Sequence, residues 1–307
     1  MIKLVLLTGF LGTGKTTLLK QLLREFKDEK IGVIVNEFGQ IGIDGSLVEK
    51  EGIKMTELTN GSIFCACIKD NFINSLIALS KEDISYVFIE ASGLADPASM
   101  SQIIKGISPQ TTVPYDYRGS ICVVDAETFL DYYDLLPALH QQVAYSGGTI
   151  VNKVDLVDED KLADILEKLA SINAIAPIYV TTYCDVEFRK LIDEIKVPDK
   201  PDEESSNTVE SRPKTFVLTA DKTLSRKAME AFLHDLMEDS YRIKGFANTE
   251  DGTLYVSGVR NHMEIVPWEE PAEKTEIVII SAVGIRMMSM ITKGLKGELK
   301  DILNITL

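Results

Sequence analysis

A glycine-rich segment near the amino end has the residue types and spacing of a phosphate-binding loop. Residues 9–16 read Gly-Phe-Leu-Gly-Thr-Gly-Lys-Thr, which fits G-x-x-x-x-G-K-[ST] between an apolar run and a helical pattern. Glycines let the backbone wrap closely round phosphates, and a helix amino terminus adds partial positive charge. The Lys15 ammonium can reach terminal phosphates, and the Thr16 hydroxyl can ligate Mg²⁺. The nucleotide contacts expected here are Gly9, Gly12, Thr13, Gly14, Lys15, Thr16 and Thr17.

Two acidic residues lie where hydrolysis of a nucleoside triphosphate needs them. Glu90 ends the buried strand pattern 86–89, so its carboxylate is expected to approach Mg²⁺ directly or through water. Gly93 follows and can offer its N–H to the γ-phosphate. Glu37 belongs to a loop that could sense the same phosphate. Either Glu90 or Glu37 is predicted to position the attacking water.

A second motif predicts which base is bound. Asn152-Lys153-Val154-Asp155 closes another apolar strand pattern. The Asp155 carboxylate can accept two hydrogen bonds from guanine, which adenine does not offer at that edge. The Lys153 stem is expected to lie over the base, and Asn152 to tie the loops together. Residues 181–183, after the next strand, are predicted to close over the base edge.

Composition excludes several classes of function. The 307 residues carry 47 Asp and Glu against 32 Lys and Arg, a formal charge of −15, which argues against a nucleic-acid partner. No apolar run approaches the ~18 residues of a membrane span. Four cysteines are too few for a disulfide framework. A cytoplasmic protein with reduced thiols is expected.

The elements that must position these motifs alternate between strand and helix. Continuous apolar strand patterns indicate burial on both faces, so a mostly parallel sheet flanked by helices is predicted. The predicted strands are 2–8, 31–36, 85–90, 119–125, 148–152 and 177–181. The predicted helices are 15–26, 67–81, 97–105, 137–145, 158–170 and 185–195.

A polar, proline-bounded stretch at 198–213 is predicted to be a linker between two domains. The nucleotide domain is therefore placed at 1–197 and a smaller α+β domain at 214–307. The second domain is expected to contain strands 214–219, 241–247, 253–258, 262–267 and 275–281 and helices 224–238 and 285–297.

These motifs together resemble the CobW-type GTPases, which are grouped with the UreG and HypB metallochaperones. The resemblance is carried by residues 9–17, 36–39, 42–44, 90–97 and 152–155, with glutamate in place of the usual strand-end aspartate. Lys244-Gly245-Phe246 is a supporting cue for the CobW carboxyl-terminal domain. The resemblance implies slow GTP hydrolysis coupled to delivery of a metal or metallocofactor to a client protein.

The sequence departs from that family at its C-x-C-C motif. After Asn60-Gly61, Ser62 and Phe64 replace the first two cysteines, while Cys65 matches the last and Cys67 is additional. Two thiolates before a helix suit Zn²⁺ or Co²⁺ but leave a tetrahedral site incomplete.

Glu37, Glu57 or a second subunit of a homodimer could complete that site. The alternative is that Cys65 and Cys67 are small buried side chains. Cys122 and Cys184 are interpreted as packing residues.

Four functions remain open from sequence. The first is a GTPase that delivers a metal or metallocofactor to a client. The second is a GTPase factor for a corrinoid or other cofactor protein that carries no metal itself. The third is a P-loop small-molecule kinase, against which the guanine-reading motif speaks. The fourth is a GTP-binding scaffold with negligible turnover.

Overall fold

The chain divides into two compact units, Met1–Ser211 and Arg212–Leu307. The computed structural model describes residues 1–36, 53–58, 66–133, 136–198, 213–259, 262–269, 272, 274–295, 297–299 and 304–306. Most of the predicted linker, residues 199–212, lies outside this description.

The first unit is built on a seven-stranded sheet in the order β3-β2-β4-β1-β5-β6-β7. All the pairings that join these strands are parallel, so the predicted parallel α/β architecture is confirmed. Its strands are β1 (Ile2–Gly9), β2 (Ile31–Asn36), β3 (Ile53–Leu58), β4 (Tyr86–Glu90), β5 (Tyr115–Asp125), β6 (Gly148–Asn152) and β7 (Ile178–Val180).

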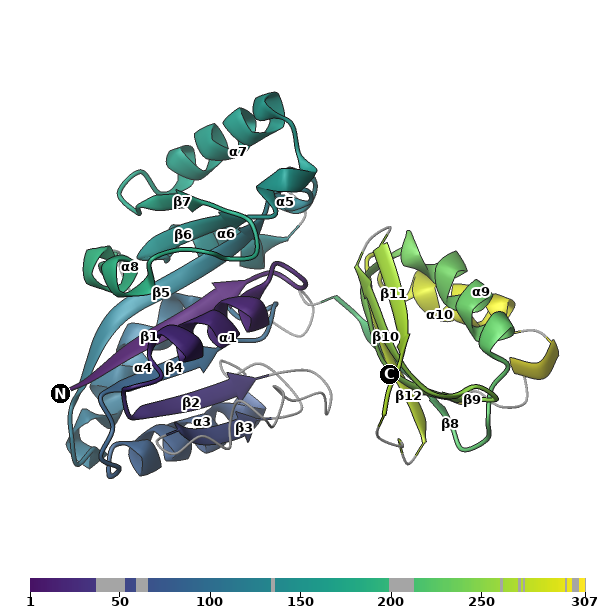
Figure 1. The fold of residues 1–307 in the computed structure, drawn as a ribbon, viewed down its shortest axis with the longest axis horizontal. Helices are drawn as coiled ribbons and strands as arrows, with labels where there is room; N and C mark the ends of the chain where they lie inside the picture. The colour runs from purple at the N-terminus through teal and green to yellow at the C-terminus, as the bar shows by residue number, and fades with distance from the viewer. Residues whose placement is uncertain are drawn as a thin grey trace. The chain divides into compact units, whose positions relative to one another are not determined.

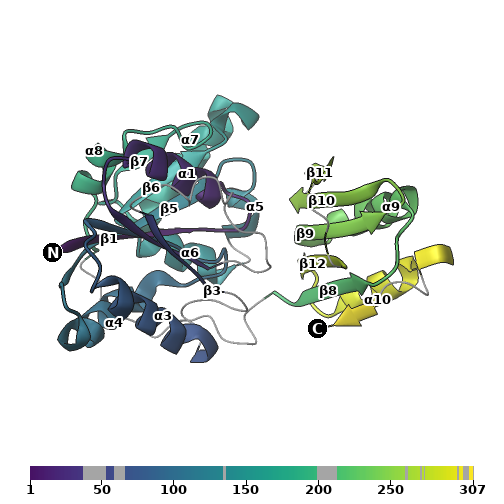
Figure 2. The ribbon, with the colours of Figure 1, turned by 60° about the horizontal axis from the view of Figure 1, so that its bottom comes forward.

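Helices cover both faces of this sheet (Figures 1 and 2). On one face, α1 and α8 pack through Leu18, Leu22 and Leu191. On the other, α3 and α4 pack through Phe72 and Ile103. The helices are α1 (Lys15–Glu25), α3 (Ala66–Leu79), α4 (Met100–Ile107), α5 (Phe129–Tyr133), α6 (Pro137–Ala144), α7 (Glu159–Ile172) and α8 (Phe188–Glu194), with 3₁₀ turns η1 (Pro97–Ser99), η2 (Ser108–Gln110) and η3 (Val154–Leu156).

The parallel arrangement gathers the motif residues at one edge of the sheet. Gly9 at the end of β1 pairs with Val123 of β5, and Asp125 at the end of β5 pairs with Asn152 of β6. Glu90 ends β4 beside Leu7. The carboxyl ends of parallel strands are where α/β proteins bind ligands, so this edge is the place for a site.

The second unit is a six-stranded sheet in the order β11-β10-β9-β12-β8-β13, with antiparallel pairings throughout its described strands. Helices α9 and α10 lie on one side of it (Figure 2). Their Phe232, Leu233 and Ile291 form a core with Leu218 and Ile243 of the sheet. Its elements are β8 (Thr215–Ala220), α9 (Arg226–Met237), β9 (Ser240–Thr249), β10 (Gly252–Val259), β11 (His262–Pro267), β12 (Thr275–Ser281), α10 (Arg286–Gly294), η4 (Gly297–Leu299) and β13 (Asn304–Thr306).

Two strands and one α-helix of the described residues were absent from the sequence predictions: β3, β13 and α5. The edge strands β3 and β13 each have a single described neighbour, β2 and β8 respectively. The pattern at 53–58 is short and partly polar, so only its pairing identifies it as a strand.

None of the helices in the described part of the chain is both long and apolar enough to cross a membrane.

Candidate functional site: a phosphate loop joined to a base loop

The segment from Gly9 to Gly14 adopts backbone that suits glycine. Gly9, Gly12 and Gly14 have φ of 136°, 76° and 111°, in the region where side chains are disfavoured. A Cβ on Gly9 would lie 2.3 Å from the Val123 carbonyl oxygen, and one on Gly14 would lie 2.6 Å from Asn152 Nδ2. The loop shape therefore depends on glycine at both positions.

Lys15 begins α1, and its side chain turns back into the loop. The ammonium donates to the carbonyl oxygens of Gly9 at 2.9 Å and Phe10 at 2.8 Å. The residue is only 8 % exposed, so this positive charge is concentrated at the loop. The Thr13 hydroxyl also donates to the Phe10 carbonyl, at 3.0 Å. Thr17 follows Thr16 in the first turn of α1.

The predicted magnesium residues lie in direct contact. Thr16 Oγ1 donates to Glu90 Oε1 at 2.7 Å, joining α1 to the end of β4. Glu90 is 2 % exposed. A hydroxyl and a carboxylate beside a phosphate loop are the hard oxygen donors that Mg²⁺ prefers, so the residues present fit this ion.

The loop that follows Glu90 is held against the phosphate loop. A Cβ on Gly93 would lie 2.7 Å from the Leu11 nitrogen, so this approach requires glycine. From α6, Gln142 Nε2 donates to the carbonyls of Gly93 at 3.2 Å and Ala95 at 2.9 Å. Gln142 was not singled out from sequence, because its carbonyl partners lie more than forty positions earlier.

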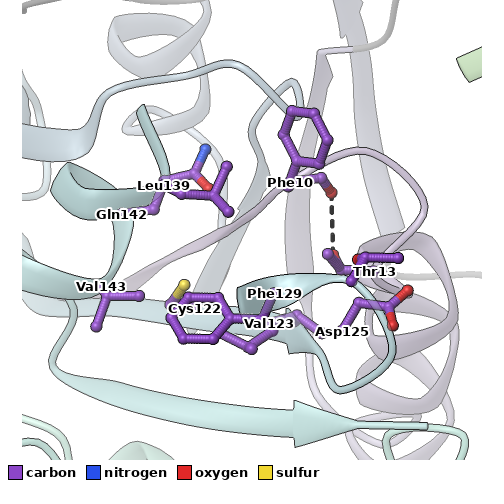
Figure 3. Close-up of a pocket in the computed structure, with 11 residues that line it drawn as sticks. Phe10, Thr13, Cys122, Val123, Asp125, Phe129, Leu139, Gln142 and Val143 are labelled. Atoms are coloured by element: carbon purple, nitrogen blue, oxygen red, sulfur yellow. Dashed lines mark hydrogen bonds between the residues drawn. The ribbon is translucent and has the colours of Figure 1, made fainter. Parts of the chain in front are cut away.

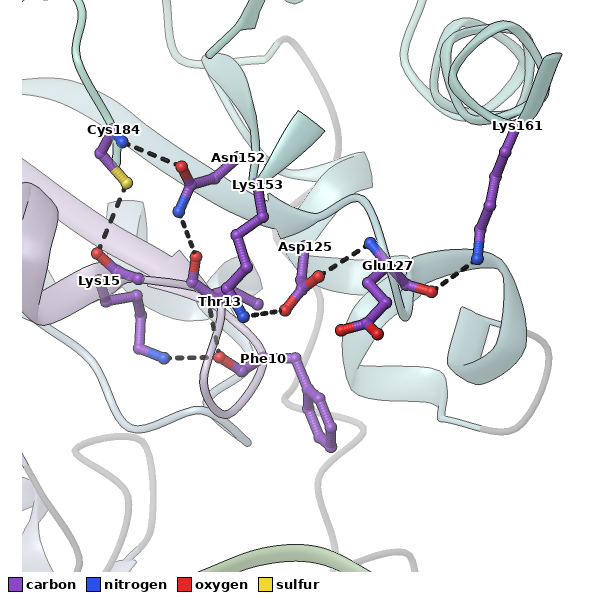
Figure 4. Close-up of polar contacts among 10 residues, drawn as sticks. Phe10, Thr13, Lys15, Asp125, Glu127, Asn152, Lys153, Lys161 and Cys184 are labelled. Atoms are coloured by element: carbon purple, nitrogen blue, oxygen red, sulfur yellow. Dashed lines mark hydrogen bonds and ion pairs between the residues drawn. The ribbon is translucent and has the colours of Figure 1, made fainter. Parts of the chain in front are cut away.

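Asn152 is the first residue of the segment 152–155, called here the base loop, and it joins this loop to the phosphate loop (Figure 4). Its Nδ2 donates to the Thr13 carbonyl at 2.9 Å, and its Oδ1 accepts from the Cys184 N–H at 2.9 Å. The residue is 3 % exposed, and both ends of its amide are engaged. The tie expected from sequence is therefore present, while direct contact with a nucleotide stays a prediction.

The two other base-loop residues have distinct partners. The Lys153 ammonium pairs with Asp125 Oδ2 at the end of β5. Asp155 Oδ1 accepts from the Thr182 hydroxyl at 3.1 Å, so residue 182 of the predicted closing segment lies beside the proposed guanine acceptor. Tyr183 is 74 % exposed, and its carbonyl accepts from the Gln21 side chain.

A small pocket adjoins the phosphate loop on the α6 side (Figure 3). Its lining includes Phe10, Cys122, Phe129, Leu139 and Gln142. The lining residues include no lysine or arginine, and their one charged group is the Asp125 carboxylate. The pocket therefore does not offer the cationic groups that phosphate binding requires.

Cys122 and Cys184 are buried, as the sequence predicted. Burial raises the pKa of Cys122 to about 12, against weaker opposing effects of Thr8 and Lys15. Burial also raises the pKa of Cys184 to about 12, against an opposing effect of Lys153. Both side chains are buried, and neither belongs to a group of three His, Cys, Asp or Glu side chains among the described residues, so packing is the role that fits them.

The predicted metal-ligand residues cannot be placed in the same detail. Glu37 and Cys65 lie outside the described residues. Cys67 belongs to α3, but its side chain is not described. Among the described residues, no three His, Cys, Asp or Glu side chains form a metal-binding cluster.

The fold and this site define a P-loop nucleotide-binding protein. The CobW/HypB/UreG nucleotide-binding domain matches residues 3–180, and the cobalamin synthesis protein CobW carboxyl-terminal domain matches residues 214–299. The chain belongs to the CobW/HypB/UreG family, which confirms the resemblance found in the sequence.

Named relatives include proteins from bacteria and yeast. The chain is 30% identical over 289 residues to the zinc chaperone YjiA of Escherichia coli, covering 88% of this chain and 89% of that protein. It is 27% identical over 315 residues to the zinc-regulated GTPase metalloprotein activator 1 of Saccharomyces cerevisiae, covering 89% and 70%. The crystal structure of Zn(II)-bound YjiA GTPase from E. coli shares the fold, with a TM-score of 0.51 at 24% identity over 96% of this chain and 99% of that chain.

Proposed function

We propose that this protein binds and hydrolyses GTP and couples its nucleotide state to delivery of Zn²⁺ to a client protein. The observation that carries the hydrolytic part is the 2.7 Å contact between Thr16 and Glu90. It places a hydroxyl and a buried carboxylate beside the phosphate loop in a member of the CobW/HypB/UreG family. Relatives named as a zinc chaperone and as a zinc-regulated GTPase metalloprotein activator support the cargo.

Each residue of the phosphate loop has a defined task in this proposal. The loop N–H groups and the Lys15 ammonium would bind the β- and γ-phosphates and stabilise charge on the transferring phosphoryl group. Thr16 and Glu90 would hold Mg²⁺, with Glu90 acting directly or through water. When bound, that ion neutralises charge between the phosphates. Gly93, held against Leu11 and by Gln142, would offer its N–H to the γ-phosphate.

Glu90 and Glu37 remain the two candidates for orienting the attacking water. The Glu90 carboxylate engages Thr16, which favours a role for it on the magnesium side. Glu37 follows β2, whose carboxyl end lies next to β4 in the sheet. Substituting each glutamate by glutamine separates the two roles: loss of Mg²⁺-dependent nucleotide affinity marks the metal-side residue, and loss of turnover alone marks the water-side residue.

In this proposal, Asp155 and Lys153 discriminate between guanine and adenine nucleotides. The Asp155 carboxylate would accept the two guanine donors, and the Thr182 hydroxyl keeps one of its oxygens oriented. Because Asn152 bonds to the Thr13 carbonyl, base and phosphate recognition are structurally linked. We expect GTP and GDP to bind better than ATP and ADP by ~10²-fold or more, since a carboxylate placed to accept the two guanine donors has no such partners in adenine.

Zn²⁺ is the proposed cargo, with Cys65 and Cys67 as its thiolate ligands. Glu37, Glu57 or the same residues of a second copy in a homodimer would supply the remaining positions. Co²⁺ is a chemically similar alternative for such a donor set. Neither the corrinoid-factor alternative nor the small-molecule kinase is favoured by the relatives, whose names describe zinc chaperones and GTPases.

The decisive experiment compares nucleotides on the native protein and on Asp155→Asn. Titration calorimetry should show GDP binding far more tightly than ADP to the native protein. The variant should prefer xanthosine diphosphate, because the new amide can donate to the 2-oxo group of xanthine. Single-turnover hydrolysis should be slow, on the order of 10⁻⁴–10⁻² s⁻¹, and absent in Lys15→Ala. Equal affinity of the native protein for GDP and ADP would contradict the proposed base specificity.

A further inference from the structure

Asp125 is a buried carboxylate that the proposed function leaves without a task. It is the last residue of β5 and is 2 % exposed. Its Oδ1 accepts from the Glu127 N–H at 2.9 Å, and its Oδ2 pairs with the Lys153 ammonium at 2.5 Å (Figure 4). One oxygen of the carboxylate therefore stabilises the turn after β5, and the other oxygen contacts Lys153 of the base loop.

Lys153 is held in an unusual conformation. Its backbone has φ of 63° and ψ of 35°, a left-handed conformation that non-glycine residues seldom adopt. The Val154 N–H donates to the Thr181 carbonyl at 3.4 Å, and the Ala126 N–H donates to the Asn152 carbonyl at 3.0 Å. The base loop is thus hydrogen-bonded on both sides, to Thr181 just after β7 and to Ala126 just after β5. These bonds fix the backbone from which the Lys153 side chain extends.

The ion pair with Asp125 fixes the position of the ammonium group at the end of the Lys153 side chain. A lysine side chain that is fixed in one conformation loses rotamer entropy, and this cost falls on ligand binding when the free side chain is mobile. In Figure 4 the Lys153 side chain extends from the base loop to Asp125, past Thr13 of the phosphate loop. Its apolar stem is therefore held between the base loop and Asp125.

We propose that Asp125 is a positioning residue for base recognition, which holds the Lys153 stem as a preformed platform for guanine. The inference rests on the proposed function, because it assigns a role within the proposed guanine site. The platform keeps the base in the plane where Asp155 can accept both guanine donors. A misplaced guanine loses those bonds, whereas adenine has none to lose, so Asp125 contributes to specificity as well as affinity.

A purely structural role explains the ion pair less well. Buried ion pairs contribute little net stability, because desolvation of both charges offsets their attraction. Asp125→Asn keeps the shape of the side chain and an oxygen for the Glu127 N–H. It removes the negative charge that orients the ammonium. This variant therefore tests orientation with small disturbance of packing.

The experiment is a double-mutant cycle on nucleotide affinity, with Mg²⁺ present and folding checked by thermal melting. Asp125→Asn should weaken GDP binding about tenfold and leave ADP binding nearly unchanged, as expected for loss of a charge-assisted contact. Lys153→Met, which keeps an apolar stem, should also weaken GDP. Asp125→Asn in the Lys153→Met background should cause no further loss of GDP affinity.

The matched control is Asp193→Asn. Asp193 of α8 also pairs with a lysine, Lys3, at 3.7 Å, but its side chain is 70 % exposed, and Lys3 lies at the amino end of β1, whereas the base loop follows the carboxyl end of β6. This variant should leave GDP and ADP affinity unchanged. It makes the same chemical change without touching the site.

Several outcomes would overturn the inference. A native protein that prefers GDP, together with an Asp125→Asn variant that keeps the full preference, would refute it while leaving the proposed function intact. Equal losses of GDP affinity from Asp125→Asn in the native and Lys153→Met backgrounds would also refute it, because Asp125 would then act independently of Lys153. A native protein without guanine preference would refute both proposals.

Discussion

Asn152 donates its side-chain amide to the main-chain carbonyl of Thr13, 139 positions earlier in the chain, at 2.9 Å. The bond connects the loop after β6 with the loop before α1. Since the opposite end of the same amide accepts from the Cys184 N–H, one side chain holds three loops at the carboxyl edge of the sheet. Changes in the base loop are therefore expected to reach the phosphate loop through this residue.

The first prediction is that Asn152→Ala lowers both stability and nucleotide affinity. Two hydrogen bonds are lost and the buried Thr13 carbonyl loses its partner, so we expect about 1–3 kcal/mol of destabilisation. GDP affinity should fall about tenfold or more, because the two recognition loops are no longer aligned. Urea denaturation and titration calorimetry measure the two effects.

Asn173→Ala is the matched control for that change. Asn173 is also buried, and its Nδ2 donates to the carbonyls of Val143 and Ser146 at 3.0 Å each, away from the base loop. This variant should lose similar stability and keep its GDP affinity. Equal losses of affinity in both variants would show that the Asn152 effect is only a general loss of stability.

The second prediction concerns two glycines with opposite surroundings. Gly14→Ala should destabilise the protein and abolish tight GDP binding, because φ is +111° and the new methyl would lie 2.6 Å from Asn152 Nδ2. The backbone conformation alone costs about 1–2 kcal/mol. Gly106 lies in α4, and a Cβ added there would have nothing within 4 Å, so Gly106→Ala should stabilise by about 0.4–1 kcal/mol.

Both variants are measured by urea denaturation and GDP titration. The Gly106→Ala protein should bind GDP as the native protein does. If Gly14→Ala bound GDP normally, the described shape of the phosphate loop would not be the binding shape. A destabilised Gly106→Ala protein would contradict the open space described at that position.

The phosphate loop was predictable because its determinants are local. Gly9, Gly14 and Lys15 lie within one short segment whose spacing follows from the geometry of a strand, a tight turn and a helix. The parallel sheet was predictable for a similar reason, since strands such as 86–90 are apolar at successive positions. Burial on both faces leaves few alternatives to a sheet covered by helices.

Residues that act over long separations were not predictable in the same way. Gln142 is one polar position on α6, and only the fold brings it to Gly93 and Ala95. Asp125 reads in sequence as an ordinary strand-end acid, and its pairing with Lys153 depends on β5 and β6 being neighbours. The strand at 53–58 is defined by its pairing with β2 rather than by its own pattern.

The third prediction concerns stability at alkaline pH. Burial raises the pKa of Cys122 and of Cys184 from 9.0 to about 12 in the folded protein. Above pH 9 the unfolded chain releases these thiol protons while the folded chain retains them. The folded state then binds more protons, so stability falls as pH rises from 9 towards 12 and is unaffected by these thiols below pH 9.

The measurement is urea denaturation at several pH values for the native protein and a Cys122→Ala/Cys184→Ala variant. Each thiol should contribute a decline of about 1.4 kcal/mol per pH unit within that window. The variant lacks this part and should show a shallower decline. Lysines and tyrosines titrate in both proteins, so they cancel in the comparison. Parallel curves would contradict the raised pKa values.

The last prediction concerns the zinc cargo and the two remaining cysteines. If Cys65 and Cys67 are ligands, the native protein should take up about one Zn²⁺ per chain or per dimer in competition with a chromophoric chelator, and Co²⁺ should give thiolate charge-transfer bands. Cys65→Ser with Cys67→Ser should remove both signals and keep GDP binding. The Cys122→Ala/Cys184→Ala variant should retain both, because those two side chains are buried and, among the described residues, neither belongs to a group of three metal-ligating side chains.

Zinc affinity should also depend on the bound nucleotide. A coupling of ~1–3 kcal/mol would change Zn²⁺ affinity roughly 5–150-fold between the GDP form and the form with a non-hydrolysable GTP analogue, and Zn²⁺ must change the nucleotide affinity by the same factor. The serine variant should lose this coupling in both directions, while its GDP and GTP affinities in the absence of zinc stay at native values. Unchanged zinc stoichiometry in the serine variant would place the cargo site elsewhere. Tight zinc binding with no dependence on nucleotide would support a resident metal instead of a delivered one.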